Sequence, residues 1–195
     1  MVQSLNLAGI ATAFRVLARP SLVVPNIVVD DLRSINFKDL KDERGIRAIA
    51  FDKDNTLTAP YQNEIHPPFQ DAWNTCKEVF GKHRIVIVSN SAGTPDDVGS
   101  REAERVEAAL GVHVLRHRIK KPLGGEELTQ HLGLPPSQIA VVGDRLLTDV
   151  VFGNLNGNLT ILTRKIVTTQ GDNRLAAMIR RAEHWLIDWL QARGR

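Results

Sequence analysis

Short apolar runs alternate with stretches of helical periodicity along most of the chain after residue 45. The apolar runs are rich in Ile, Val and Leu, as strands buried on both faces are, and the stretches between them place apolar residues on one helical face. Strands are predicted at 46–51, 84–88, 112–115, 138–142 and 159–162. Helices are predicted at 68–80, 94–110, 125–132 and 174–192. This order predicts an α/β fold, a three-layer Rossmann-like parallel sheet with helices on both faces.

Residues 1–44 follow a different pattern and are predicted to form an N-terminal segment ahead of one domain spanning 45–195. No acidic residue precedes Asp30, and Arg15 and Arg19 lie off the apolar side of a predicted amphipathic helix. That apolar side consists of Leu7, Ile10, Ala11, Phe14, Leu17 and Ala18. We expect this helix to lie in a membrane interface. The alternatives are packing against the domain or another subunit, or a role in mitochondrial targeting.

Composition excludes several classes of protein. Cys76 is the single cysteine, so the chain has no intramolecular disulfide and no cysteine-based zinc site. The net charge is +3, and its basic residues gather in patches such as the acid-free run 111–121. This modest excess favours anionic ligands or membranes, and no nucleic-acid partner is expected. The sequence carries no signal for an oligomeric state.

Polar side chains follow four of the predicted strands. In chain order they are Asp52 and Asp54, Ser89 and Asn90, Lys120 or Lys121, and Asp144. The carboxyl ends of parallel strands meet at one edge of a sheet, where open α/β folds bind their ligands. We therefore expect these groups to share one crevice. Alternation along a strand would also place Asp52 and Asp54 on the same face.

This set of groups predicts phosphoryl chemistry. Two carboxylates so close repel each other unless a cation lies between them, and oxygen ligands favour a hard divalent ion such as Mg²⁺. Mg²⁺, a lysine and hydroxyl groups together can receive a phosphoryl group. One aspartate can then attack phosphorus and form an aspartyl-phosphate. A second can protonate the leaving alkoxide and later deprotonate water.

The run Asp52-Lys53-Asp54-Asn55-Thr56 matches the DxDxT signature of the haloacid dehalogenase-like phosphatases, which the chain resembles. The other motifs of that superfamily match Ser89, Lys121, and Gly143-Asp144 with Asp149. The resemblance implies that Asp52 is the nucleophile and a Mg²⁺ ligand. It implies that Asp54 is the general acid/base, with its backbone carbonyl also on the metal. Asp144 would complete the metal site, and Asp149 would orient it.

The same resemblance implies how the phosphate is held. Thr56 and Ser89 would bind it, with help from the backbone of Asn90. Lys121 would stabilise the charges of the nucleophile and the phosphoryl group, and Lys120 is the alternative motif lysine. The histidines are expected to be surface or packing residues, because this mechanism needs no imidazole.

The intervals in which this superfamily inserts cap domains are short here. Residues 59–84 and 91–120 each hold little more than one helix and its connections. We therefore expect a capless domain with an open site. An open site favours a phosphate displayed on something large, which could be a lipid in a membrane, a protein or a nucleic-acid end.

The whole chain is similar to the eukaryotic mitochondrial phosphatidylglycerophosphate phosphatases. The resemblance lies in Pro20–Val29, Asn36-Phe37, the Asp-Lys-Asp-Asn run and Gly171-Asp172-Asn173. It implies a peripheral enzyme on the matrix side of the mitochondrial inner membrane. That enzyme converts phosphatidylglycerophosphate to phosphatidylglycerol, on the route to cardiolipin. The alternatives are a phosphatase for a soluble sugar phosphate, nucleotide or phosphoprotein, and a noncatalytic phospholipid-binding scaffold.

Lys53 lies between the two motif aspartates, and strand alternation directs it away from the metal. We expect it at the rim of the site, where it would meet the second phosphate of the lipid or other anionic head groups. A plain surface lysine is the alternative. Further basic residues expected in this patch are Arg116, Arg118, Arg164 and Lys165.

Overall fold

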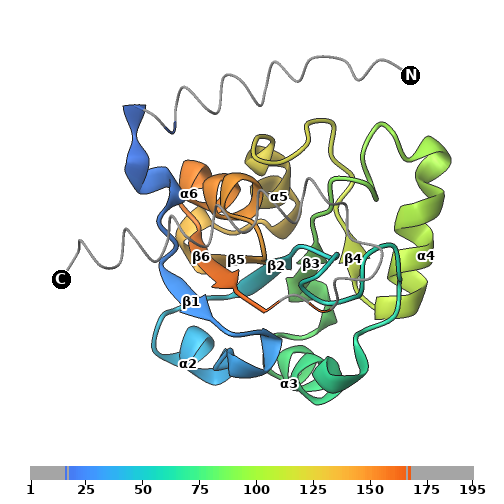
Figure 1. Ribbon diagram of the computed structural model, residues 1–195, viewed down its shortest axis with the longest axis horizontal. Coiled ribbons are helices and arrows are strands. Elements are labelled where there is room, and N and C mark those ends of the chain that lie inside the picture. Colours follow the sequence, from blue (N-terminus) through green and yellow to red (C-terminus); the bar gives the residue numbers. More distant parts are fainter. Residues whose placement is uncertain (1–15, 17, 166, 168–195) are drawn as a thin grey trace.

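The computed structural model describes residues 16, 18–165 and 167, which form a parallel sheet covered by helices (Figure 1). The six strands of the sheet lie in the order β1-β6-β5-β2-β3-β4, and all neighbours are parallel. They are β1 (Ile27–Val29), β2 (Ala48–Phe51), β3 (Ile85–Ile87), β4 (His113–Val114), β5 (Ile139–Gly143) and β6 (Leu159–Thr163). The α-helices are α2 (Phe37–Asp42), α3 (Gln70–Phe80), α4 (Arg101–Leu110), α5 (Gly125–Leu132) and α6 (Val151–Asn156).

Short helical turns complete the described elements. Six are 3₁₀ turns: η1 (Pro20–Val23), η2 (Leu32–Ser34), η3 (Pro67–Phe69), η4 (Lys82–Arg84), η5 (Val98–Ser100) and η6 (Pro136–Gln138). A π-helical turn, η7 (Leu146–Val150), leads directly into α6. No described helix combines the length and the apolar character that crossing a bilayer requires.

Two apolar clusters, one on each face of the sheet, confirm the predicted three layers. Along β2, Ile49 and Phe51 join the larger cluster, which includes side chains of α2, α3 and α4. Ala48 and Ala50 join the other cluster with side chains of α5 and α6. This alternation is the period-two pattern of a strand, here with large residues on one face and small ones on the other. Figure 1 shows α2 and α3 on one side of the sheet and α5 and α6 on the other.

The structure contains an edge strand that the sequence analysis missed. Residues Ile27–Val29 form β1, which pairs with β6 in register Ile27↔Ile161. The side chain of Asn26 extends this pairing, because its Oδ1 accepts the Thr160 N–H at 2.8 Å. The described part of the lead-in segment therefore adds a strand and helix α2 to the domain that we placed at 45–195. Most of the predicted amphipathic helix, and the predicted closing helix 174–192, lie outside the described residues.

Helix α4 begins at Arg101, seven positions later than predicted. The carboxylate of Asp97 explains this, because it accepts the N–H groups of Gly93, Glu102 and Ala103, each at 2.9 Å. Asp97 therefore closes the preceding loop and caps α4. Gly99, which lies between Asp97 and the start of the helix, has a left-handed φ of 69°. The segment 94–97 is thus part of the loop that follows β3.

Candidate active site

The ends of β2, β3 and β5 lie side by side at the centre of the sheet, because these strands are direct neighbours. Asp52 follows β2 immediately, and its N–H donates to Val142 O of β5 at 2.8 Å. Its backbone therefore continues the sheet by one hydrogen bond. Its carboxylate lies at the carboxyl edge of the strands, with a side chain that is 16% exposed. This is the place in an open α/β sheet where a ligand is expected.

Three carboxylates gather at this edge. Asp52, Asp144 and Asp149 each offer an oxygen atom, and these oxygens lie within 4.8 Å of one another. Asp144 and Asp149 are buried. Gly143 makes the close approach of Asp149 possible, because a Cβ at residue 143 would lie 2.3 Å from Asp149 Cγ. The side chain of Asp54 is not part of this group.

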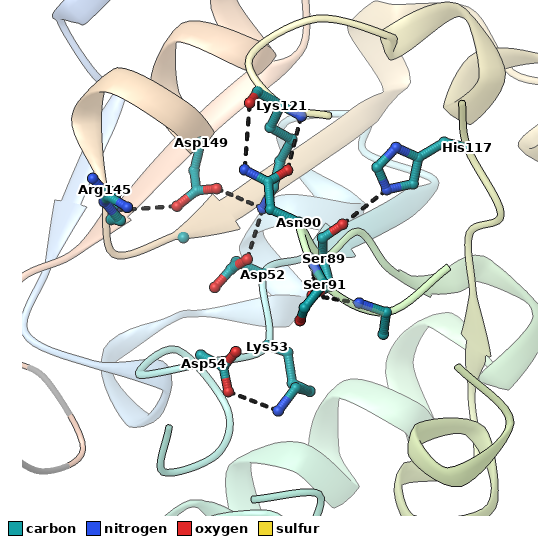
Figure 2. Close-up of polar contacts among 12 residues, drawn as sticks. Asp52, Lys53, Asp54, Ser89, Asn90, Ser91, His117, Lys121, Arg145 and Asp149 are labelled. Atoms are coloured by element: carbon teal, nitrogen blue, oxygen red, sulfur yellow. Dashed lines mark hydrogen bonds and ion pairs between the residues drawn. The ribbon is translucent and has the colours of Figure 1, made fainter. Parts of the chain in front are cut away.

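Lys121 lies between two of the carboxylates (Figure 2). Its Nζ donates to Asp52 Oδ1 at 2.7 Å and to Asp149 Oδ1 at 2.6 Å. Burial alone lowers the pKa of Lys121, but the charges of Asp149 and Asp52 outweigh it and raise this pKa above its ordinary value. Lys120 is instead exposed and pairs with Asp96 at 2.5 Å. Of the two candidate lysines, the structure brings Lys121 into the group.

The donor set fits a hard divalent cation. Burial raises the pKa of Asp149, Lys121 opposes this effect, and the charge of Asp52 adds to it, so that this pKa lies above its ordinary value. Lys121 binds Asp52 and Asp149, and oxygens of all three carboxylates lie close together in a mostly buried place. Carboxylate oxygens within one ion's reach are the ligands that Mg²⁺ and Ca²⁺ prefer. Asp52, Asp144 and Asp149 together offer such a set of oxygens.

The loop after β3 fixes the position of Lys121 from the other side. The side chain of Asn90 binds the backbone of Lys121 at both ends, accepting its N–H at 2.8 Å and donating to its carbonyl at 3.3 Å. These two hydrogen bonds, one accepted and one donated, require an amide side chain at the residue after Ser89. Asn90 contributes through its side chain to the position of the lysine. Its predicted backbone contact with phosphate stays a prediction.

Ser89 and Thr56 are both buried near the strand ends. Ser89 Oγ accepts the N–H groups of Ser91 and Ala92 at 3.1 and 3.3 Å, which fixes its orientation. Thr56 Oγ1 has no hydrogen-bond partner among the described residues, although it is fully buried. A buried hydroxyl without a protein partner is rare in a folded protein, and this one could bind an oxygen atom of a substrate. Asn55, beside it, has a left-handed φ of 63° and turns the chain at this point.

The comparisons with known proteins agree with this geometry. The model of the family described as mitochondrial PGP phosphatase matches residues 7–168. The chain belongs to this family. It is 42% identical over 193 residues to phosphatidylglycerophosphate phosphatase 1, chloroplastic/mitochondrial, of Arabidopsis thaliana, which covers 97% of this chain and 55% of that protein. The chain thus spans about half the length of this relative.

Two further relatives are similar over most of their own length. Identity is 33% over 165 residues with phosphatidylglycerophosphatase GEP4, mitochondrial, of Saccharomyces cerevisiae, covering 82% of this chain and 88% of that protein. Identity is 28% over 177 residues with the probable phosphatase YqeG of Bacillus subtilis, covering 85% and 95%. The predicted resemblance to the PGP phosphatase family is therefore confirmed.

The prediction that Lys53 faces the rim is wrong. Lys53 is buried, and its Nζ donates to Asp54 Oδ1 and to Gln62 O, both at 2.7 Å. Strand β2 ends at Phe51, so the alternation on which the prediction rested does not reach residue 53. The chain turns there instead, because the N–H groups of Leu57 and Thr58 both donate to Lys53 O. Asp54 is 34% exposed, and it is held by Lys53 rather than placed beside Asp52.

The other residues of the predicted basic patch are mostly engaged. Arg116 binds the Glu107 carboxylate, and its Nη2 lies 2.9 Å from Glu107 Oε2. Lys165 pairs with Asp30 at 2.6 Å. Arg118 is the exception, with a side chain that is 92% exposed and a long 3.3 Å contact to Glu127. Fewer basic side chains of this predicted patch are therefore available to an anionic ligand than the sequence suggested.

His117 is a site-supporting residue that sequence reasoning missed. It is buried, with Nε2 at 2.8 Å from Ser89 O and Nδ1 at 2.8 Å from Ile119 O. The ring thus joins the loop that carries Ser89 to the loop that carries Lys121 (Figure 2). His117 lies four residues before Lys121, but its contact with Ser89 spans 28 positions, and no local sequence pattern signals a contact of that kind.

Proposed function

We propose that this chain is a Mg²⁺-dependent phosphatase that removes the terminal phosphate of phosphatidylglycerophosphate, giving phosphatidylglycerol on the route to cardiolipin. The observation that carries this proposal is Lys121 bound to Asp52 and Asp149 within a group of three carboxylates. The family match supports it, as do relatives that are themselves named phosphatidylglycerophosphate phosphatases.

Asp52 is the proposed nucleophile. One of its carboxylate oxygens attacks phosphorus while the P–O bond to the glycerol oxygen breaks, and an aspartyl-phosphate forms. Lys121, hydrogen-bonded to Asp52 at 2.7 Å, holds the attacking carboxylate in place and balances charge on the phosphoryl oxygens. The leaving alkoxide takes the proton of Asp54. Asp54 then removes a proton from the incoming water, whose oxygen displaces Asp52 from phosphorus and releases phosphate.

Mg²⁺ is the proposed metal, and Asp52, Asp144 and Asp149 would hold it. When bound, it supplies positive charge that neutralises the phosphoryl oxygens. The hydroxyls of Ser89 and Thr56 are the proposed ligands of those oxygens. Thr56 Oγ1 is the stronger case, because a phosphate oxygen would satisfy a buried group that has no partner among the described residues.

The cellular setting forms part of the same proposal. A phospholipid substrate requires contact with a membrane surface, and we propose peripheral association in which the N-terminal segment takes part. The relatives are named mitochondrial, chloroplastic or both, which supports an organelle location. The matrix side of the mitochondrial inner membrane is the site that we propose.

Phosphate release from phosphatidylglycerophosphate vesicles, compared with release from soluble sugar and nucleotide phosphates, tests this function. We expect wild-type activity on the lipid that EDTA removes and Mg²⁺ restores. Asp52→Asn should lower the rate about a thousandfold or more, since it removes the nucleophile. Asp42→Asn, which changes an exposed aspartate at the end of α2, is the matched control. Activity on soluble substrates alone would overturn the lipid assignment, and activity on neither would favour a noncatalytic scaffold.

A further inference from the structure

The exposed apolar side chains of the described residues are concentrated at one edge of the sheet. Large exposed hydrophobic residues are Tyr61 (77%), Val98 (80%), Ile119 (50%), Leu147 (41%) and Val24 (45%). Single exposed apolar residues are common on protein surfaces and need no explanation. Here, however, every one except Val24 lies in a segment that leaves the carboxyl end of a strand. Tyr61 follows β2, Val98 follows β3, Ile119 follows β4 and Leu147 follows β5.

Two of these residues are joined by their backbones to the proposed catalytic groups. The N–H of Tyr61 donates to Asp54 Oδ1 at 3.0 Å, so that the backbone of this exposed residue is bound to the proposed general acid. Ile119 lies two residues before Lys121, and its carbonyl is 2.8 Å from His117 Nδ1. Both side chains are therefore fixed relative to the site rather than carried on distant loops.

The other two lie on the remaining loops of the same edge. Leu147 belongs to the π-helical turn η7, which also carries Asp149 of the carboxylate group. Val98 lies in the loop after β3, two residues beyond Asp96, which binds Lys120 of the loop after β4. Each strand end that contributes to the site thus also contributes one exposed apolar side chain.

We propose that Tyr61, Val98, Ile119 and Leu147 form an apolar rim that docks the mouth of the active site on an anionic lipid bilayer. This inference rests on the proposed function, because a lipid phosphate lies at the level of the head groups and an uncapped site must come to it. Aromatic and aliphatic side chains on loops enter the bilayer interface, where tyrosine is enriched. The exposed guanidinium of Arg118, beside Ile119, adds the positive charge that anionic head groups attract.

Vesicle flotation and activity measurements on the full-length chain test the rim. The probe is vesicles of phosphatidylcholine and phosphatidylglycerol, and the variant is Val98→Ser/Leu147→Ser. Neither residue belongs to the proposed catalytic, phosphate-binding or metal-binding groups. We expect the double variant to bind the vesicles at least about tenfold more weakly than the wild type, because burial of each aliphatic side chain in the bilayer favours binding. The fraction of protein that floats with the vesicles measures this affinity. The ratio of activity on phosphatidylglycerophosphate vesicles to activity on a soluble phosphomonoester should fall by a similar factor. Val24→Ser is the matched control, because it removes an exposed valine away from this edge.

The outcomes separate the rim from the proposed function. Wild-type binding and an unchanged activity ratio in the folded double variant would overturn the rim and leave the phosphatase assignment standing. If the double variant binds vesicles more weakly than the wild type, but the wild type has no lipid phosphatase activity, the rim is supported and the proposed function is overturned. A change in oligomeric state with unchanged vesicle binding would show that the rim contacts a second copy instead, and would overturn the proposal. Melting temperatures of both variants establish that they are folded.

Discussion

Gly143→Ala tests the arrangement of the carboxylate group with the addition of one methyl group. Gly143 ends β5 directly before Asp144, and a Cβ at this position would lie 2.3 Å from Asp149 Cγ. Ordinary contact between carbon atoms needs about 3.5 Å, so Asp149 or the strand must move by about 1 Å. Asp149 is buried and bound by Lys121 at 2.6 Å and by the Arg145 N–H at 3.1 Å. A shift of that size breaks or lengthens both contacts.

The magnitude follows from this displacement. A misplacement of about 1 Å in a catalytic group can lower the rate about a hundredfold, and we expect kcat to fall by about that factor. Overpacking in a buried place costs about 1–3 kcal/mol of the free energy of unfolding. For a chain of this length, each kcal/mol lowers Tm by roughly 2–4 °C. Phosphate release and thermal unfolding, measured on the same preparation, give the two quantities.

Gly133→Ala is the control for loss of stability without loss of geometry. Gly133 ends α5 with a φ of +62°, and nothing lies within 4 Å of a Cβ placed there. An alanine in this left-handed conformation costs about 1–2 kcal/mol, similar to the cost expected at residue 143. Its kcat should stay close to that of the wild type. If Gly143→Ala retained activity within about twofold of the wild type, the position of Asp149 would not matter and the proposed site would be wrong.

Two further predictions concern the loops that hold the site. Lys53→Met should lower activity on lipid vesicles and on a soluble phosphomonoester by the same factor, about tenfold, because the lost ammonium positions Asp54 in both reactions. A loss confined to vesicles would show that Lys53 meets lipid after all. Asp97→Ala should lower the free energy of unfolding at pH 7 by about 1 kcal/mol through the lost cap of α4. Burial raises the pKa of Asp97, but the N–H groups of Gly93, Glu102 and Ala103 outweigh it and lower this pKa below its ordinary value. The stabilisation is therefore present above about pH 4 and lost as the pH falls through the folded-state pKa. Urea unfolding at pH 7 and below about pH 4 measures this effect. The difference in the free energy of unfolding between wild type and variant should be smaller at the lower pH, and an equal difference at the two pH values would contradict this account.

The strand ends were predictable because two independent signals coincide there. Apolar runs define β2, β3 and β5, and polar residues such as Asp52, Ser89 and Asp144 interrupt each run at its carboxyl end. Parallel pairing then brings those ends together without further information. The edge strand β1 carried no such signal. It is only three residues long, and its register is fixed by Asn26 and Thr160, which are 134 positions apart.

The resemblance favoured Lys121 over Lys120, and the contacts of Asn90 give the physical reason. Both lysines lie in the same loop, and both are charged. The amide of Asn90 binds the backbone of Lys121 at two points and thereby fixes the loop, so that Nζ of Lys121 enters the carboxylate group. Lys120 is then directed towards Asp96 at the surface. A tertiary contact across 31 positions therefore decides which lysine serves the site.

Lys53 shows how a correct motif can still mislead about the residue inside it. The spacing of Asp52 and Asp54 suggested a continuing strand, yet the backbone turns as soon as β2 ends. A buried ammonium is costly unless acceptors surround it, and here Asp54 and the Gln62 carbonyl supply them. The burial of Lys53 therefore requires both the side chain of Asp54 and the loop that carries Gln62. Asp54, in turn, is held by the lysine and by the Tyr61 N–H. The residue between the two aspartates is thus a structural partner of the proposed general acid, and its effect on catalysis should not depend on the presence of a membrane.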